Sequence, residues 1–213
     1  MKKILKVSAL LLLLLLGVAL LFSSCNKKPP KELMPPDYSD IALSDYVSLG
    51  EYKGLKVAIG GVVSEDMTND LVLWETIVRN AGVIKYPDDA LSYYKEQTTR
   101  LYMGYAEEGS MSYDELMTSL GKTDEDIEEE AKEYVKSDLV RLAIIEAEGL
   151  YLTDDEKARL FDKYAYKFEV TYGYTTEYVR ENLTDEIYDA MQHDKMMEFL
   201  LLNNEIIAIT EEE

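Results

Sequence analysis

Apolar residues recur every three or four positions over most of the chain after residue 68, the spacing that places them on one face of an α-helix. The longest such pattern runs over 124–148 and predicts one long helix with a buried face. The same spacing predicts further helices at about 69–81, 88–107, 112–121, 153–170, 175–182 and 184–204. Short breaks separate these segments, so the pattern indicates an all-α fold.

The ends of the predicted helices carry recognisable signals. "SYDE" at 112–115 and "TDDE" at 153–156 have the spacing of a capping box, in which a hydroxyl and a carboxylate satisfy each other's backbone N–H groups. Gly121 and Gly149 follow the last apolar positions of their helices, where glycine is favoured as the terminating residue. The helix boundaries are therefore predicted more closely than the apolar pattern alone allows.

One segment does not follow the helical pattern. The stretch "LGEYKGLKVAIGGVV" at 49–63 has the composition of a β-strand, and no second strand pattern follows it. We expect 49–66 to be an extended junction that lies along the helical body, with Leu55, Val57 and Ile59 packed inward or partly so. The helical region itself is predicted to form one domain over 67–207.

The N-terminus has the order of features of a secretory signal. Three lysines precede an apolar run over 7–22, and small residues follow it. This run is shorter than the roughly 20 residues that a membrane-spanning helix needs. Residues 1–24 are therefore predicted to be a signal peptide that is removed, rather than a permanent membrane anchor.

Cys25 is the only cysteine and directly follows two serines. A lone cysteine at this place resembles the lipobox of bacterial lipoproteins, in which the thiol is alkylated by diacylglycerol and becomes the new N-terminus. The alternative is a buried free cysteine that follows a plain signal sequence. We predict lipidation at Cys25, which leaves the mature chain without disulfides and tethers it to the extracytoplasmic face of the cell membrane.

Residues 25–48 hold four of the five prolines and show no sustained periodicity. Paired prolines favour extended conformations, so this segment is predicted to be a semi-stiff tether between the lipidated cysteine and the folded body. At the other end of the chain, 208–213 is predicted to be an acidic tail.

The chain has 42 acidic and 22 basic residues and a formal net charge of −20. Such a charge repels nucleic acids and anionic lipid headgroups, which argues against both as partners. The acyl group, rather than surface charge, is expected to hold the protein to the membrane.

The sequence contains no set of residues typical of an enzyme. His193 is the only histidine, and we interpret it as a structural or surface residue because no serine or cysteine nucleophile can be paired with it. The acidic run at 123–130 lacks the glycine and the spacing of a calcium-binding loop, and suits the solvated start of a helix. We expect no metal, no cofactor and no catalytic residues.

The unusual feature of the composition is its 17 tyrosines and nine methionines. Tyrosine combines an apolar ring with a polar edge, and methionine adapts its shape to different partners, so both suit the binding of unfolded segments. The alternative is that most of these side chains line the core between helices.

The order of several segments resembles trigger factor, the bacterial chaperone. "LGEYKGLKV" looks like the stretch with which that family leaves its N-terminal domain, and "LWETIVRNAGVIKYPDDALSYYKEQ" is similar to the entry into its C-terminal domain. The segment from "SYDELMTSLGK" to "LTDDE" resembles the central arm helix and the helix after it, and "DKMMEFLLLNNEI" resembles the closing helix. Together these segments cover about 49–207.

The resemblance implies a chaperone body with long arm helices that cradle unfolded polypeptide, a fold related to that of exported SurA-type chaperones. The chain lacks the FKBP-like prolyl isomerase domain and the ribosome-docking loop of the family, so we expect neither prolyl isomerisation nor ribosome binding. On position alone, the residues predicted to line a peptide-binding groove are Tyr93, Tyr94, Tyr102, Met103, Tyr164 and Tyr166.

The leading hypothesis from the sequence is a membrane-anchored extracytoplasmic chaperone that binds unfolded or newly exported polypeptides without ATP. Two alternatives stay open at this point. One is a peptidyl-prolyl cis-trans isomerase, by family association, and the other is a structural or interaction lipoprotein with one fixed partner.

Overall fold

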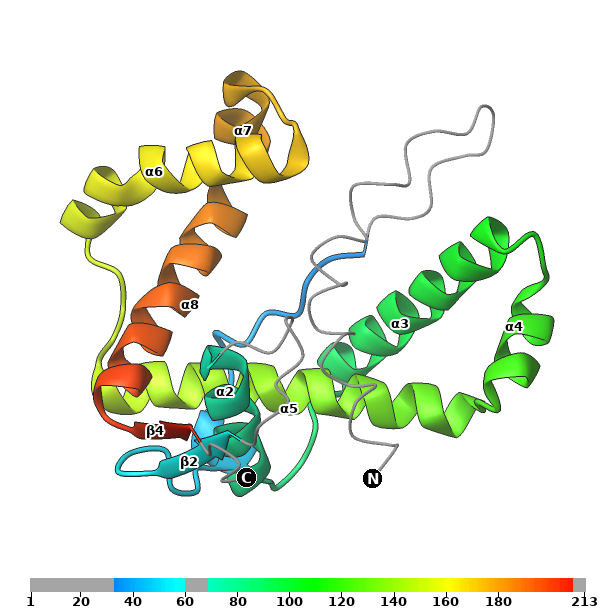
Figure 1. The fold of residues 1–213 in the computed structure, drawn as a ribbon, viewed down its shortest axis with the longest axis horizontal. Coiled ribbons are helices and arrows are strands. Elements are labelled where there is room, and N and C mark those ends of the chain that lie inside the picture. The colour runs from blue at the N-terminus through cyan, green and yellow to red at the C-terminus, as the bar shows by residue number, and fades with distance from the viewer. Residues whose placement is uncertain (1–32, 60–68, 209–213) are drawn as a thin grey trace, which may run out of the picture. The chain divides into compact units, whose positions relative to one another are not determined.

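The computed structural model describes residues 33–59 and 69–208 and is predominantly helical, which confirms the predicted all-α class (Figure 1). The described part contains one 3₁₀ turn, seven α-helices and four short strands. In chain order these are η1 (Leu43–Asp45), β1 (Val47–Ser48), β2 (Lys56–Ile59), α2 (Asn69–Asn80), β3 (Gly82–Val83), α3 (Asp88–Glu108), α4 (Tyr113–Leu120), α5 (Asp124–Glu148), α6 (Asp154–Tyr172), α7 (Thr176–Asn182), α8 (Thr184–Leu202) and β4 (Glu205–Ala208).

The chain forms two compact units. Among the described residues, unit 1 consists of 33–48 and 81–140, and unit 2 consists of 49–59, 69–80 and 141–208. The predicted helical region at 67–207 is thus divided between two units. Helix α5 contributes its residues up to Val140 to unit 1 and its last turns to unit 2.

Unit 1 is built on α3, on α4, which packs against α3, and on the first part of α5. Tyr102, Met117 and Ile127 form a buried cluster, one residue from each of the three helices. Helix α4 begins with the predicted capping box, because Ser112 Oγ accepts from the Glu115 N–H and the Ser112 N–H donates to Glu115 Oε2 at 2.8 Å.

The last part of the predicted tether belongs to unit 1. β1 pairs antiparallel with β3 in the register Val47↔Val83, and the Ile84 N–H donates to the Tyr46 carbonyl at 2.7 Å. Further upstream, the Tyr38 hydroxyl donates to Asp138 Oδ2 on α5 at 3.2 Å. In the predicted spacer at 25–48, the residues from Tyr38 onward therefore make specific contacts. Only the residues before Tyr38 can act as a free spacer.

Unit 2 contains α2, α6, α7 and α8. Its buried cluster is contributed by α6, α7 and α8 and consists of Tyr164, Ala165, Val179, Ile187 and Met191. Helix α6 begins with the second predicted capping box, formed by Thr153 and Glu156, and ends at Gly173 in the left-handed conformation. These caps fix the start and the end of α6 and hence the positions of the side chains along it.

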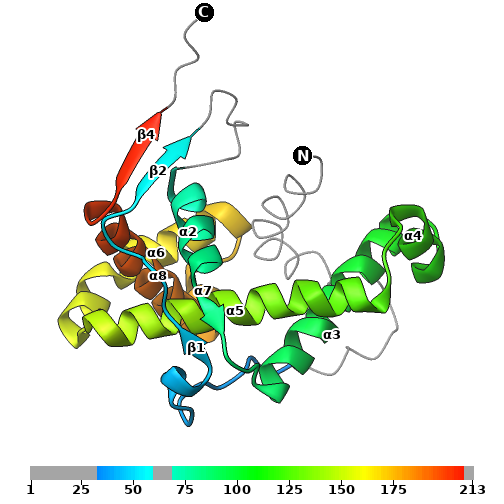
Figure 2. The ribbon, with the colours of Figure 1, turned by 90° about the horizontal axis from the view of Figure 1, so that it is seen from below.

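The extended segment has a partner strand that the sequence pattern did not reveal. β2 pairs in parallel with β4, in the register Val57↔Ile206, and the two strands lie side by side in Figures 1 and 2. The last helix was predicted to continue to 204 but ends at Leu202, because the chain turns there into β4. The expected packing is confirmed for Val57, which is buried, and for Leu55, which is half-buried; the Ile59 side chain lies outside the described part of the structure.

Asn204 joins the extended segment to the end of α8. Its Oδ1 accepts from the Leu55 N–H at 2.8 Å, and its Nδ2 donates to the Tyr52 carbonyl at 3.0 Å and to the Leu200 carbonyl at 2.7 Å. An amide side chain can bond to both the segment before β2 and the end of α8 because it is a donor and an acceptor.

We expect Asn204→Ala to lower the free energy of unfolding by about 1–2 kcal/mol, because it leaves partly buried backbone groups without partners. Urea unfolding followed by circular dichroism measures this. The matched control is Asn203→Ala, since the exposed Asn203 side chain makes a single hydrogen bond, to the Phe199 carbonyl. Equal stability of the two variants would contradict the assigned role of Asn204.

The stability of unit 2 is predicted to depend on pH through Glu156. A hydrogen bond from Lys195 and the capping contacts with Thr153 lower the pKa of the Glu156 carboxyl from 4.5 to about 2. A group whose pKa is depressed in the folded state stabilises the fold above its ordinary pKa and loses this contribution as the pH falls toward its folded value. The contribution of Glu156 is therefore lost between about pH 5 and pH 2.

Glu156→Gln is accordingly expected to flatten the decline of the urea midpoint over this acidic range and to lower the midpoint at neutral pH. Glu181→Gln is the control, because Glu181 on α7 makes no hydrogen bond or ion pair within the described residues. A decline of unchanged slope in Glu156→Gln would show that another group carries the acid sensitivity.

Candidate functional site

Two of the tyrosines predicted from sequence, Tyr93 and Tyr94, form an aromatic cluster in unit 1. The Tyr94 hydroxyl donates to Asp138 Oδ2 at 2.5 Å, and its ring stacks on Tyr134 with the ring centroids 5.5 Å apart. The Tyr93 ring meets the Tyr94 ring edge-on at 5.1 Å. Burial and the neighbouring Asp138 carboxylate raise the pKa of the Tyr94 hydroxyl well above its ordinary value. These rings join α3 to α5, and the Asp138 carboxylate that accepts from Tyr94 also accepts from the Tyr38 hydroxyl.

Tyr102 and Met103 are adjacent in the sequence but have opposite environments. Tyr102 is 3% exposed and points into the core of unit 1, where its hydroxyl donates to Glu130 at 3.2 Å and the Lys122 ammonium lies over its ring. Met103, the next residue along α3, is 47% exposed. Tyr102 is a core residue, and of this pair only Met103 offers a surface to a partner.

The two predicted residues of unit 2 also separate. Tyr164 is 7% exposed in the core of the unit, and its hydroxyl donates to Asp194 Oδ2 on α8 at 2.6 Å. Burial and this carboxylate raise the pKa of the Tyr164 hydroxyl. Tyr166 is 65% exposed on the outer face of α6. Of the six predicted residues, four belong to unit 1 and two to unit 2, and only Met103 and Tyr166 are exposed.

Unit 2 contains an open hollow between α6, α7 and the first turns of α8. It has a volume of about 360 Å³, and its lining residues are Lys157, Ala158, Phe161, Asp162, Arg180, Thr184 and Tyr188. A second hollow of about 320 Å³ shares Lys157 and Tyr188 with the first and is also lined by Tyr151, Leu152, Asp185, Asp189 and Gln192. The two adjoining hollows are referred to below as the α6–α8 groove.

Two aromatic rings and two cations organise the groove. Phe161 and Tyr188 meet edge-on, with their ring centroids 5.9 Å apart. The Lys157 ammonium lies 5.0 Å from the centroid of the Tyr188 ring, and the Arg180 guanidinium carbon lies 5.5 Å from that of Phe161. Arg180 is held in place by an ion pair of 2.6 Å with Asp162. Each ring is thus paired with a cation, at a distance at which the two attract each other.

The far end of the groove is fixed by Gln192. Its Oε1 accepts from the Leu152 N–H at 3.0 Å, and its Nε2 donates to the Leu150 carbonyl at 2.9 Å. This amide pins the loop that carries Tyr151 against α8. Nearby, Asp189 forms an ion pair with Arg141 of α5. The wall around Tyr188 therefore rests on regular helices and on a loop held by side-chain hydrogen bonds.

The side chains that line the α6–α8 groove set the chemistry that it can support. Its side chains offer aromatic faces, cations and carboxylates, and none is a serine or cysteine nucleophile or a histidine. His193 lies outside the groove and meets the Trp74 ring edge-on at 6.4 Å, and burial together with Arg141 lowers the pKa of its imidazole. Within residues 33–59 and 69–208, no group of three acidic, histidine or cysteine side chains is placed to hold a metal ion.

Phe161, Tyr188 and Lys157 were not singled out from the sequence. Each belongs to a helix whose boundaries were predicted, but the groove depends on the packing of α6 against α8, and Phe161 and Tyr188 are far apart along the chain. In the sequence, a cation and an aromatic residue four positions apart, such as Lys157 and Phe161, are too common on helices to indicate a site.

Comparison with known proteins adds no assignment. No protein-family model matches the sequence, and no curated protein is significantly similar to it. Among the described helices, none is long and apolar enough to span a lipid bilayer. Residues 1–32, which include Cys25 and the predicted signal peptide, lie outside the described part of the structure. The groove and the exposed surfaces are therefore the features of this chain that can indicate its function.

Proposed function

We propose that this chain is a membrane-anchored extracytoplasmic chaperone, which binds unfolded or newly exported polypeptides without ATP. The observation that carries the proposal is the open α6–α8 groove, in which aromatic faces alternate with charged groups. An extended polypeptide offers apolar side chains to the rings and backbone carbonyls and N–H groups to the ions, so the groove can bind it without recognising one sequence.

The exposed apolar residues of both units support the same function. Met103, Met111 and Leu120 of unit 1 are each at least 40% exposed, and Tyr151, Tyr166, Val170 and Tyr178 of unit 2 are at least 43% exposed. Single exposed apolar residues are normal on any protein, but methionine and tyrosine adapt to several partners, as the binding of unrelated clients requires. This set extends the sequence-based candidates beyond Met103 and Tyr166.

The relation to the trigger factor C-terminal domain and to SurA-type chaperones is part of this proposal. It is supported by the predominantly helical fold and by the helical order quoted from the sequence. The location is proposed from the N-terminal signal and from Cys25, with the acyl group as the membrane anchor. Because Tyr38 and the residues after it contact unit 1, only the segment between Cys25 and Tyr38 remains as spacer, which spans roughly 40–45 Å when fully extended.

The proposal is tested by aggregation of a chemically unfolded client protein in the presence of the full mature chain. We expect suppression at stoichiometric amounts and without ATP. Crosslinking in the native envelope separates this function from that of a lipoprotein with one fixed partner: a chaperone captures a broad set of proteins, whereas a fixed interaction gives one dominant species. Failure to suppress the aggregation of any client would overturn the proposal.

A further inference from the structure

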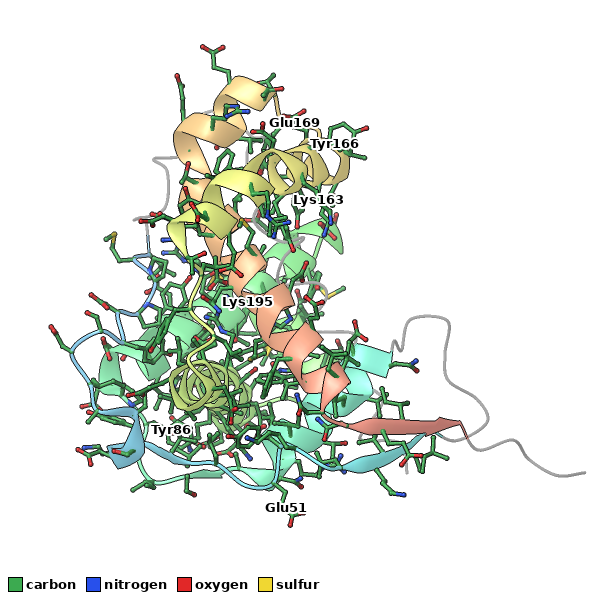
Figure 3. The ribbon with its side chains drawn as sticks, turned by 90° about the vertical axis from the view of Figure 1, so that its left-hand side faces the viewer. Glu51, Tyr86, Lys163, Tyr166, Glu169 and Lys195 are labelled. Atoms are coloured by element: carbon green, nitrogen blue, oxygen red, sulfur yellow. The ribbon has the colours of Figure 1, made fainter. Side chains whose placement is uncertain are left out.

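His193, the only histidine of the chain, lies where α8 packs against α2 in unit 2. Its imidazole meets the ring of Trp74, the only tryptophan, edge-on with the ring centroids 6.4 Å apart. Trp74 is buried and His193 is half-buried. Lys195, two positions further along the chain, marks this stretch of α8 in Figure 3. A side chain that changes its charge near neutral pH therefore lies inside a contact between two helices.

The position of α2 depends on this contact. The helix has 12 residues, a length at which an isolated helix is only marginally stable in water. Its buried residues are Leu73, Trp74 and Ile77, and the elements that it contacts most extensively are β2 and α8. Because burial of this apolar face keeps α2 in place, a charge introduced beside Trp74 acts on a helix that has little stability of its own.

Two features of the contact disfavour an imidazolium at position 193. Burial removes the charged ring from water, and the Arg141 guanidinium on α5 repels it, so both hold the pKa of His193 below 6.5, its ordinary value. The Trp74 ring gives little compensation. Its centroid lies 6.4 Å from that of the imidazole, just beyond the ~6 Å within which an aromatic face attracts a cation appreciably.

Three carboxylates near His193 favour the proton, but each is weakened by its surroundings. They belong to Asp194 and Asp189 on α8 and to Asp70 in the first turn of α2. Asp194 accepts from the Tyr164 hydroxyl at 2.6 Å, and Asp189 is paired with Arg141, so that the two charges offset each other. Asp70 is exposed, and solvent screens its charge. Burial and Arg141 therefore outweigh these carboxylates.

We propose that His193 is a pH-sensitive switch between α8 and α2: the neutral imidazole lets α2 pack on α8, and protonation of the ring loosens α2 and uncovers its apolar face. Because the packed contact binds the proton less tightly than the loosened one, loosening is favoured as the pH falls below about 6.5. Each pH unit by which the midpoint of His193 lies under that value makes the protonated contact about tenfold easier to open. This switch goes beyond the proposed function and does not depend on client binding.

Two other groups of unit 2 with shifted pKa values are distinguishable from His193. The contribution of Glu156 is lost only below about pH 5. Burial raises the pKa of the Glu75 carboxyl on α2, and such a group favours the packed helix as the pH falls, the opposite of the proposed effect. A loosening of α2 between about pH 7.5 and about pH 5.5 is therefore the expected signature of His193.

The test uses the full mature chain without a histidine tag, so that His193 gives the single imidazole resonance in a proton NMR titration. Hydrogen exchange of the α2 amides, corrected for the intrinsic effect of pH, and the emission maximum of Trp74 are followed over the same pH range. The α6 amides are the internal control, because α6 belongs to the same unit and the carboxylate that caps it, Glu156, titrates only in more acidic solution.

We expect the His193 resonance to titrate with a midpoint below 6.5. With the same midpoint, the α2 amides should exchange faster and the Trp74 emission should move to longer wavelength, while α6 stays protected. His193→Gln and His193→Asn keep a neutral side chain at all these pH values and should abolish the response of α2. Arg141→Gln removes the repelling guanidinium and should move the midpoint upward.

A midpoint at or above 6.5 would show that the contact accommodates the imidazolium, and this result would overturn the switch. Amides of α2 that stay protected while the resonance titrates would overturn it as well. Circular dichroism at neutral pH establishes which of the two His193 variants is folded. A loosening of wild-type size in a folded variant would assign the pH response to another group.

Discussion

Gly50→Ala is expected to lower the free energy of unfolding by about 3 kcal/mol, at the upper end of the range for overpacking. A Cβ at Gly50 would lie 2.2 Å from the backbone oxygen of Asn80 and 2.7 Å from its carbonyl carbon. Backbone atoms cannot rotate out of the way, and the two segments are tied together by the Asn80 side chain, which donates to the Glu51 carbonyl at 3.1 Å. The close approach of the extended segment to the end of α2 therefore requires glycine.

The matched control is Gly104→Ala. Gly104 lies inside α3, and a Cβ built there would have no neighbour within 4 Å. Alanine should raise stability by about 0.5–1 kcal/mol, because glycine is a poor helix former. Urea unfolding of both variants measures the difference. If Gly50→Ala unfolded at the wild-type midpoint, the described approach of residue 50 to Asn80 would be incorrect.

Tyr188→Ala is expected to weaken the binding of unfolded polypeptide by about 1–2 kcal/mol, a roughly five- to thirtyfold rise in Kd. Tyr188 borders both hollows of the groove, meets Phe161 edge-on and carries Lys157 over its ring. Its removal takes away an aromatic wall and leaves Lys157 without the ring beneath it. Fluorescence anisotropy of a labelled, chemically unfolded client measures the affinity.

Two further variants separate binding from folding. Tyr188→Phe keeps the ring and should bind nearly as well as the wild type, while Lys157→Glu should weaken the binding of acidic clients more than that of basic ones. Circular dichroism and urea unfolding of Tyr188→Ala establish that the helices remain folded. Wild-type affinity in a folded Tyr188→Ala protein would show that the α6–α8 groove does not bind the unfolded polypeptide.

The helices could be predicted because their determinants are local. The long segment at 124–148 has its apolar residues at helical spacing, and α5 occupies the same residues. The capping boxes at Ser112 and Thr153 use residues three apart and form as predicted. Local spacing and end signals suffice wherever contacts within one turn of the chain decide the structure.

The strands and the groove could not be predicted because they depend on contacts between distant residues. Asn204 bonds to the Leu55 N–H across 149 positions, and without that contact "LLNNEI" reads as the end of a helix. Whether a tyrosine is exposed also depends on contacts between distant residues. Tyr164 and Tyr166 are two positions apart on α6, yet the first is buried and the second exposed, since the packing of α6 on α8 decides which face is inward.

The most direct test of the central claim is the binding of one client in its unfolded and its native form to the full mature chain, measured by anisotropy without nucleotide. If the protein is a chaperone, we expect saturable binding of the unfolded form, no measurable binding of the native form, and competition by unrelated unfolded chains. Equal binding of both forms, or no binding of the unfolded form, would contradict the assignment of this protein as a chaperone.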